Sequence, residues 1–228
     1  MNTTGYVLYS GPSRLNQHPI IAILTLHSKN RKTGDMPQVW ILPADVLPTK
    51  AAASGEDEAV CGDCAFRPVF TVGVREVKNC YVTLIHGPNQ IWTGFHRGIY
   101  STDWPPIINR PVRWGSYGDP AALPIRILMK LADTCAAGHT AYTHQWRRFQ
   151  ALRHYMMASV NNADEQAEAT RQGWRTFRVI QENDEQEENV TGEIDCPYPR
   201  TTCFKCRLCD GKINLQDRRK NITVVAHL

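Results

Sequence analysis

Residues 112–135 read VRWGSYGDPAALPIRILMKLADTC, and this stretch decides the class of fold that the sequence predicts. The run 112–117 has the composition of a short strand, and Gly118-Asp119-Pro120 ends it. Residues 121–135 then show the apolar periodicity of a helix, and Gly138 is a signal for its end. A strand followed directly by a helix is the first part of a βαβ unit.

The same alternation continues toward the C-terminus. Strands are predicted at 139–145, 155–160 and 176–180, and helices at 146–153 and 162–173, the second of which Asn162 can cap. Four strands that alternate with three helices favour parallel βαβ units, because parallel strands need crossover connections. We therefore predict an α/β protein with a partial (β/α)6 TIM-like barrel, followed by a C-terminal cysteine-rich segment that binds a metal or cluster.

Upstream of this region, the sequence predicts simpler elements. The apolar runs 20–26 and 38–42 are expected to be neighbouring strands, and the small polar residues of 48–60 a loop. Residues 87–100 carry Ile91, Trp92, Phe95 and Ile99 at helical spacing, which predicts an apolar stripe that faces the core. The apolar residues 222–226 predict a last strand.

The length favours one domain over 1–228, because 228 residues with 42% hydrophobic composition can bury a full core. Within it we distinguish N-terminal strands and a loop (1–60), a cluster loop with the barrel core (61–180), and a C-terminal part (181–228). The last part contains an acidic run at 181–189 that is expected to be a solvated loop.

The charge and hydropathy of the chain narrow the function classes. A formal net charge of +4 is too small to mark a dedicated nucleic-acid binder. No apolar run approaches the ~20 residues of a membrane helix, and the polar N-terminus lacks the apolar region of a signal peptide. We expect no membrane association and a cytoplasmic location.

Seven of the eight cysteines fall into two groups, which favours metal ligation over disulfides in a chain without a secretion signal. The first group is Cys61, Cys64 and Cys80, with no fourth cysteine nearby. Three protein ligands leave one coordination position open for water, substrate or cofactor. His86, Asp63 or Cys135 could instead complete a closed zinc site, or the two cysteine groups could share ligands.

The second group is Cys196, Cys203, Cys206 and Cys209. Its CxxCxxC run is typical of [4Fe–4S] ferredoxins, whereas zinc sites commonly use two separated CxxC pairs. Metal binding is therefore expected here, with an iron–sulfur cluster favoured over zinc.

Small and polar residues stand where the predicted parallel strands end, which is the edge at which ligands bind in such sheets. These residues are Gly115, Ser116, Gly118, Asp119, Thr143, His144, Gln145, Ser159, Asn161 and Asn162. They predict a ligand pocket beside the first cysteine group.

The order of these motifs resembles the radical S-adenosylmethionine (AdoMet) superfamily. Three cysteines that end in Cys80-Tyr81 precede a strand with GSYGDPAALP (115–124) and a strand with ASVNNADE (158–165). The pattern, with its closing TTCFKCRLC segment (201–209) and a final strand with His227, is similar to bacteriophage proteins of the gene product 88 type. Fifteen residues separate Cys64 from Cys80, where the superfamily has a short spacing.

The resemblance implies specific roles. Cys61, Cys64 and Cys80 would hold a [4Fe–4S] cluster whose open iron binds AdoMet, and a reductant such as flavodoxin or ferredoxin would supply electrons. Tyr81, Gly118, Asp119, Ser159 and Asn161 would bind the cofactor, and His144 and Gln145 would face an unknown substrate. The C-terminal cysteines would hold an auxiliary cluster. If the chain is phage-encoded, it would act in the host cytoplasm.

A second interpretation is a non-catalytic, zinc-stabilised binding protein, possibly for nucleic acid. In it, arginines such as Arg147, Arg175 and Arg219 would contact phosphates, and Trp146 or Trp174 would stack on bases. The simpler expectation for these charges is a solvated helix surface.

Overall fold

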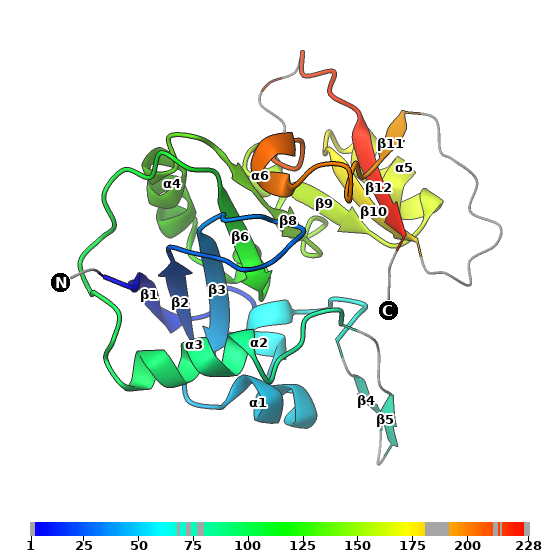
Figure 1. Ribbon diagram of the computed structural model, residues 1–228. Helices are drawn as coiled ribbons and strands as arrows, with labels where there is room; N and C mark the ends of the chain where they lie inside the picture. The colour runs from blue at the N-terminus through cyan, green and yellow to red at the C-terminus, as the bar shows by residue number, and fades with distance from the viewer. Residues whose placement is uncertain are drawn as a thin grey trace.

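Parallel strands form the centre of the molecule, as predicted (Figure 1). The computed structural model describes residues 3–67, 69–71, 74–76, 80–180, 192–211, 214 and 216–225. The acidic run 181–189 and His227 lie outside the described residues. The strands of the predicted alternation are β6 (Val112–Tyr117), β7 (His139–Thr140), β8 (Tyr142–Thr143), β9 (Met157–Val160) and β10 (Thr176–Ile180).

The first sheet has the order β1-β2-β3-β6-β7. Its N-terminal strands β1 (Gly5–Pro12), β2 (Pro19–Thr25) and β3 (Gln38–Pro43) pair antiparallel, and β3, β6 and β7 pair parallel. The sequence predicted β2 and β3 but missed β1.

The second sheet has the order β11-β12-β10-β9-β8, and all of its strand pairs are parallel. It includes β11 (Glu193–Asp195), which was not predicted, and β12 (Asn221–Val225), which was. Only Ala141 separates β7 of the first sheet from β8 of the second. The described strands form an α/β fold with two open sheets, and neither sheet closes into a barrel.

Short helices connect the parallel strands. η1 (Pro120–Ala122) and α4 (Ile125–Thr134) follow β6, η2 (Gln150–His154) follows β8, and α5 (Ala163–Arg171) follows β9. The Asn162 side chain accepts a hydrogen bond from the Glu165 N–H at 2.8 Å, which confirms the predicted cap of α5. The helix predicted at 146–153 is only the single 3₁₀ segment η2.

In the described part of the chain, three more helices lie in sequence between β3 and β6. α1 (Pro48–Ser54) and α2 (Glu58–Cys61) occupy the stretch predicted as a loop, so that prediction was wrong. Pro48 begins α1 and three alanines follow, a composition that favours helix. α3 (Gly87–His96) was predicted, but Ile99 lies beyond its end and is 53% exposed instead of buried.

A short antiparallel hairpin, β4 (Val69–Thr71) and β5 (Val74–Glu76), lies between the second and third cysteines of the first group. It extends away from the rest of the molecule (Figure 1). Among the described residues, no helix has the length and apolarity to cross a membrane.

One hydrophobic core contains buried residues from both sheets. β2 contributes five fully buried residues from Ile20 to Leu24, and Trp114 of β6 and Trp146 fill the space next to the parallel strands. Burying one large apolar side chain stabilises the folded state by roughly 1.5–3 kcal/mol. Trp114 stacks on the His139 ring at 3.8 Å, which fixes β6 against β7 where the sheets approach each other.

Candidate metal and cofactor site

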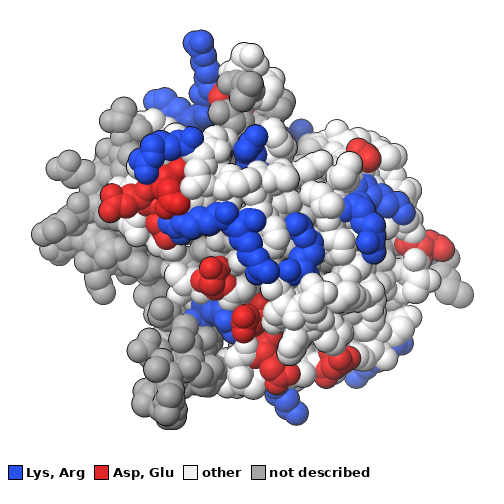
Figure 2. Space-filling view, turned by 180° about the vertical axis from the view of Figure 1, so that it is seen from behind, with Lys and Arg blue, Asp and Glu red and all other residues white. Residues whose placement is uncertain are grey.

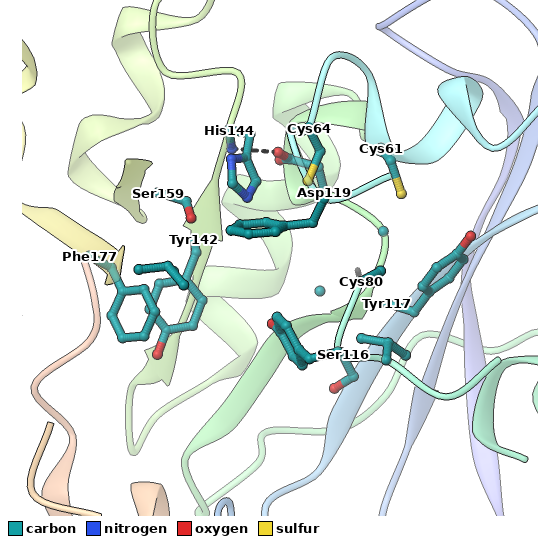
Figure 3. A pocket seen from close by; sticks show the side chains of 16 residues that line it. Cys61, Cys64, Cys80, Ser116, Tyr117, Asp119, Tyr142, His144, Ser159 and Phe177 are labelled. Carbon is teal, nitrogen blue, oxygen red and sulfur yellow. Dashed lines mark hydrogen bonds between the residues drawn. The ribbon is translucent and has the colours of Figure 1, made fainter. Parts of the chain in front are cut away.

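One cavity of about 100 Å³ lies where the parallel strands end, and three thiols line it (Figure 3). Cys61, Cys64 and Cys80 reach it from the two sides of the β4–β5 hairpin. The other lining residues come mainly from the cysteine loop, from segment 81–82 and from the strands: Phe66, Tyr81, Val82, Gly115, Ser116, Tyr117, Gly118, Asp119, Tyr142, His144, Ser159, Phe177 and Val179. The first cysteine group and most of the predicted strand-end residues therefore meet in one place.

A buried ion pair shapes the loop that carries the first two cysteines. The Arg67 guanidinium donates to Asp57 Oδ1 from Nε at 3.3 Å and from Nη2 at 2.7 Å, and also to two backbone carbonyls of the same loop. The Asp57 side chain is only 3% exposed. The Cys64 N–H donates to the Cys61 carbonyl at 3.2 Å, so that both thiols stand on one tight turn.

The electrostatics of these thiols disfavour nucleophilic catalysis. Burial raises the pKa of Cys64 to about 12, and burial together with nearby Cys64 and Asp57 raises the pKa of Cys61 well above its usual value. A neutral thiol is a weak nucleophile. A bound metal centre supplies the positive charge that turns such a thiol into a thiolate ligand.

The turn after β6 requires glycine. Gly118 has φ +79°, and a Cβ atom there would lie 2.4 Å from the carbonyl oxygen of Ile41. Gly115 has φ +69°, and its Cβ would lie 2.7 Å from the Gly118 carbonyl oxygen. The two glycines let the chain fold back on β3 and keep backbone, without side chains, at this side of the cavity.

Asp119 lines the cavity, but protein donors already occupy its carboxylate. Oδ1 accepts from the Ala121 N–H at 2.9 Å, and Oδ2 accepts from the Thr143 hydroxyl at 3.0 Å and from the His144 N–H at 2.8 Å. Burial raises its pKa to about 6, although these hydrogen bonds act in the opposite direction. Asp119 thus fixes the end of β8 to the turn after β6, a connection visible in Figure 3.

The two residues predicted to face substrate lie in different surroundings. His144 lines the cavity, where burial lowers its pKa to about 4 and keeps the imidazole neutral at pH 7. Gln145 does not line the cavity; its Nε2 donates to Asp63 Oδ1 at 2.5 Å and to the Cys61 carbonyl at 3.4 Å. Gln145 therefore stabilises the cysteine loop by hydrogen bonds from outside the cavity.

Of the other residues predicted to bind the cofactor, two line the cavity and one does not. Ser159 and Tyr81 line the cavity, and Tyr81 is 68% exposed at its rim. Asn161 does not line it, because its amide and backbone N–H both donate to Glu165 Oε2.

The cavity lining includes a buried hydroxyl group without a partner in the described part of the chain. The Ser116 hydroxyl, on a residue that is 8% exposed, has no hydrogen-bond partner within the described part of the chain. A buried hydroxyl of this kind costs free energy unless a ligand or water satisfies it. The Ser116 hydroxyl therefore offers one hydrogen bond to a molecule that binds in the cavity.

The four C-terminal cysteines line a second, smaller cavity of about 20 Å³. α6 (Cys203–Cys206) holds two of them, while Cys196 follows β11 and Cys209 is buried beside the second sheet. The structure thus separates the two predicted cysteine groups into two neighbouring cavities. All eight cysteines are free thiols.

In neither cavity do the side chains converge on a point. No three His, Cys, Asp or Glu side chains in the described ranges stand close enough together to hold a single metal ion.

Tyr142 and Phe177 are site residues that the sequence did not reveal. Both line the first cavity and the second one. Each lies in a short strand, where an aromatic residue is expected in the core in any case. The only signal in the sequence was the position of Tyr142 two residues before His144.

The side chains proposed for nucleic-acid binding are largely engaged elsewhere. Trp146 and Trp174 are 1% and 2% exposed and cannot stack on bases. Arg175 is buried and donates to three backbone carbonyls, and Arg147 pairs with Glu165 and Glu168. On the face shown in Figure 2, basic and acidic side chains are interspersed.

Comparison with known proteins gives no relative for this site. No family model matches the sequence, and no match was found among curated proteins or solved structures.

Proposed function

We propose that this protein is an iron–sulfur enzyme of the radical-AdoMet type, acting on a substrate that is not yet known. Cys61, Cys64 and Cys80 would hold a [4Fe–4S] cluster, and AdoMet would occupy the rest of the first cavity. The observation that carries the proposal is the meeting of these three thiols with the ends of parallel strands in one cavity.

The strand order supports the finer fold that this function requires. β3 pairs parallel with β6, β6 with β7, β8 with β9, β9 with β10, and β10 with β12. If β7 and β8 are counted as one strand interrupted at Ala141, six parallel strands follow one another. We propose that they act as a partial (β/α)6 barrel with the cavity at its carboxyl edge.

The chemistry belongs to the cofactors, and the protein supplies binding and shielding. If a cluster and AdoMet are bound, they would supply radical chemistry: one electron from the reductant would break a C–S bond of the AdoMet sulfonium, leaving methionine and a 5′-deoxyadenosyl radical able to take a hydrogen atom from the substrate. The chain's own residues would bind and orient: the Ser116 and Ser159 hydroxyls offer hydrogen bonds, and the Gly115 and Gly118 backbone allows close approach. The neutral imidazole of His144 would face the substrate.

Three further properties belong to the proposal. The four C-terminal cysteines would hold a second metal centre, for which zinc is the alternative to a cluster. A small reductant protein such as flavodoxin or ferredoxin would donate electrons. The cytoplasm is the compartment in which eight free thiols persist, since they would be oxidised in a secreted protein.

Anaerobic purification tests the proposal directly. The wild-type protein, reconstituted with iron and sulfide, is expected to be brown and to release 5′-deoxyadenosine when dithionite and AdoMet are added. Cys80→Ala is expected to abolish this release, because Cys80 is a cluster ligand at the exposed rim of the cavity.

Cys135→Ala is the matched control. Cys135 is buried beside Trp114 and lines neither of the two cysteine cavities, so its loss should leave iron content and product release unchanged. Colourless protein that holds stoichiometric zinc at both cysteine groups would refute the enzyme and favour the zinc-stabilised binding protein.

A further inference from the structure

Arg14 and Arg148 approach the same aromatic ring from two distant parts of the chain. The guanidinium carbon of Arg14 lies 4.3 Å from the centre of the Phe149 ring, and that of Arg148 lies 5.0 Å from it. A guanidinium is attracted to the face of an aromatic ring, and this contact restricts its orientation. The connection between β1 and β2 and the segment before η2 therefore bring two positive charges close together.

Both guanidinium groups have N–H donors left over. Arg14 Nη1 donates to the Leu123 carbonyl at 3.4 Å, and Arg148 Nη1 donates to the Leu15 carbonyl at 3.1 Å. With the described residues, the two side chains form no other hydrogen bond and no ion pair with Asp or Glu. Arg148 is exposed and Arg14 is half-buried, so the remaining donors of the pair are open to a ligand.

The segments that carry the two arginines are themselves fixed. The Arg14 N–H donates to the Ala122 carbonyl of η1 at 2.9 Å, and the buried hydroxyl of Ser13 donates to a carbonyl of α2 at 2.6 Å. The Arg148 N–H donates to the Gln145 carbonyl at 3.0 Å. The pair is thus preorganised, and a ligand that binds it avoids part of the free-energy cost of ordering flexible side chains.

The two charges repel each other. Burial and the nearby charge of Arg148 both lower the pKa of Arg14. Like charges held together cost free energy, and no carboxylate of the described chain pairs with either of them. A bound anion would offset this repulsion. Folds keep such unfavourable arrangements mainly at functional sites.

A phosphate monoester is the anion that matches the pair best. Each guanidinium presents its donors as a planar fork that binds two oxygens of one anion at once. A phosphate monoester carries about two negative charges at neutral pH and three strong acceptor oxygens. A carboxylate carries one charge and would leave half of the positive charge of the pair without compensation.

We propose that Arg14 and Arg148 form a binding site for a phosphate monoester, with the Phe149 ring as their common support. The phosphate belongs to a small phosphate ester or to the terminal phosphate of a nucleic-acid strand, and both present the same chemical group. The inference is independent of the function proposed above, because none of the three residues lines either cysteine cavity.

Phosphorus NMR titration of the full, reduced chain with glycerol phosphate tests the inference, with glycerol as the probe that lacks the phosphate. Glycerol phosphate is expected to bind and glycerol is not. Arg148→Gln should weaken binding about 10–100-fold, the usual cost of losing a charge-assisted hydrogen bond. Arg14→Gln should act in the same direction. Because Arg148 is exposed, its substitution leaves the fold intact and decides the test even if Arg14→Gln unfolds.

Arg147→Gln is the matched control. The Arg147 guanidinium lies 4.0 Å from the centre of the Trp146 ring, but it pairs with Glu165 at 3.2 Å and with Glu168 at 2.6 Å. Its loss changes the net charge of the protein as much as the loss of Arg148 does. It should leave the affinity for glycerol phosphate unchanged. Equal weakening in Arg147→Gln and Arg148→Gln would overturn the inference, as would a wild-type chain that binds no glycerol phosphate.

A short oligothymidylate with a terminal phosphate, compared with the same strand ending in a hydroxyl, separates the two sources of the phosphate. Tighter binding of the phosphorylated strand than of glycerol phosphate, lost in Arg148→Gln, assigns the site to a nucleic-acid end. Equal affinities of the phosphorylated strand and glycerol phosphate assign it to a small phosphate ester. Neither result depends on iron, zinc or AdoMet, so the proposed function can fail while this inference stands, and the reverse.

Discussion

The guanidinium of Arg67 and the carboxylate of Asp57 form a buried ion pair at 2.7 Å directly behind the turn that carries Cys61 and Cys64. Asp57 directly precedes α2, and Arg67 follows it, between α2 and β4. The ion pair therefore stabilises the conformation of the cysteine loop through contacts inside the loop itself. Removing one partner leaves the other charge buried without compensation.

Arg67→Met is expected to lower the free energy of unfolding by about 3–5 kcal/mol, the usual cost of breaking a buried ion pair. Urea unfolding monitored by circular dichroism measures it. Arg147→Gln is the control, because Arg147 is 49% exposed in its pair with Glu168 and should cost at most about 1 kcal/mol. Equal effects of the two substitutions would contradict the structural role given to Arg67.

His144 should make the protein sensitive to acid. Its folded-state pKa is about 4, below the ordinary 6.5, so the unfolded state takes up the proton first as the pH falls. Stability from this group is complete above pH 6.5 and is lost between pH 6.5 and 4, by up to about 3 kcal/mol. His144→Gln removes this contribution, so its unfolding free energy relative to wild type should rise as the pH falls from 7 to 4.5. A pH-independent difference would show that His144 is not buried in neutral form.

The contribution of Asp119 to stability depends on pH in the opposite direction. Its folded-state pKa of about 6 lies above the ordinary 3.8, so its contribution to stability is complete below pH 3.8 and is lost as the pH rises through 6. Thr143→Val removes a donor to the carboxylate and should raise this pKa further, which carboxyl-carbon NMR titration can follow. Thr176→Val serves as the control, since its buried hydroxyl has no hydrogen-bond partner among the described residues. A lowered pKa in Thr143→Val would contradict the assigned hydrogen bond.

A comparison of Gly118 with Gly138 distinguishes the cost of backbone strain from the cost of a steric clash. Both have φ near +80°, but a Cβ at Gly118 would meet the Ile41 carbonyl oxygen at 2.4 Å, while a Cβ at Gly138 would meet nothing within 4 Å. Gly138→Ala should cost about 1–2 kcal/mol, the penalty of the left-handed conformation. Gly118→Ala should cost clearly more and should also displace Asp119. Thermal unfolding of the two variants measures the difference, and similar melting temperatures would argue against the tight turn.

The parallel part of the fold could be predicted because each of its elements has a strong local signal. β6, β9, β10 and α5 follow from apolar runs, turn residues and the Asn162 cap. α1 was missed because its seven residues are too few to show an apolar periodicity, although alanines such as Ala51 and Ala52 favour helix. Their burial against the core, which only the tertiary structure reveals, makes that segment a helix.

The site was predictable to the extent that its residues stand at strand ends. Ser159, Asp119 and His144 gather at the cavity because parallel strands end at one edge. Gln145 and Asn161 were predicted by the same rule, but the side-chain NH2 of Gln145 donates to Asp63 of the cysteine loop and that of Asn161 donates to Glu165 of α5. Which way an amide at a strand end points depends on partners far away in sequence, and no local pattern specifies them.

The β4–β5 hairpin has a consequence for how this kind of site is found in other chains. Because its strands pair antiparallel, with Val69 opposite Glu76, the hairpin leaves the body of the protein and returns to it at nearly the same point. Adding or deleting paired residues at its tip would change the number of residues between Cys64 and Cys80 without moving either thiol. Searches that rely on a fixed cysteine spacing would overlook such chains, whereas a search for three thiols beside the ends of parallel strands would detect them.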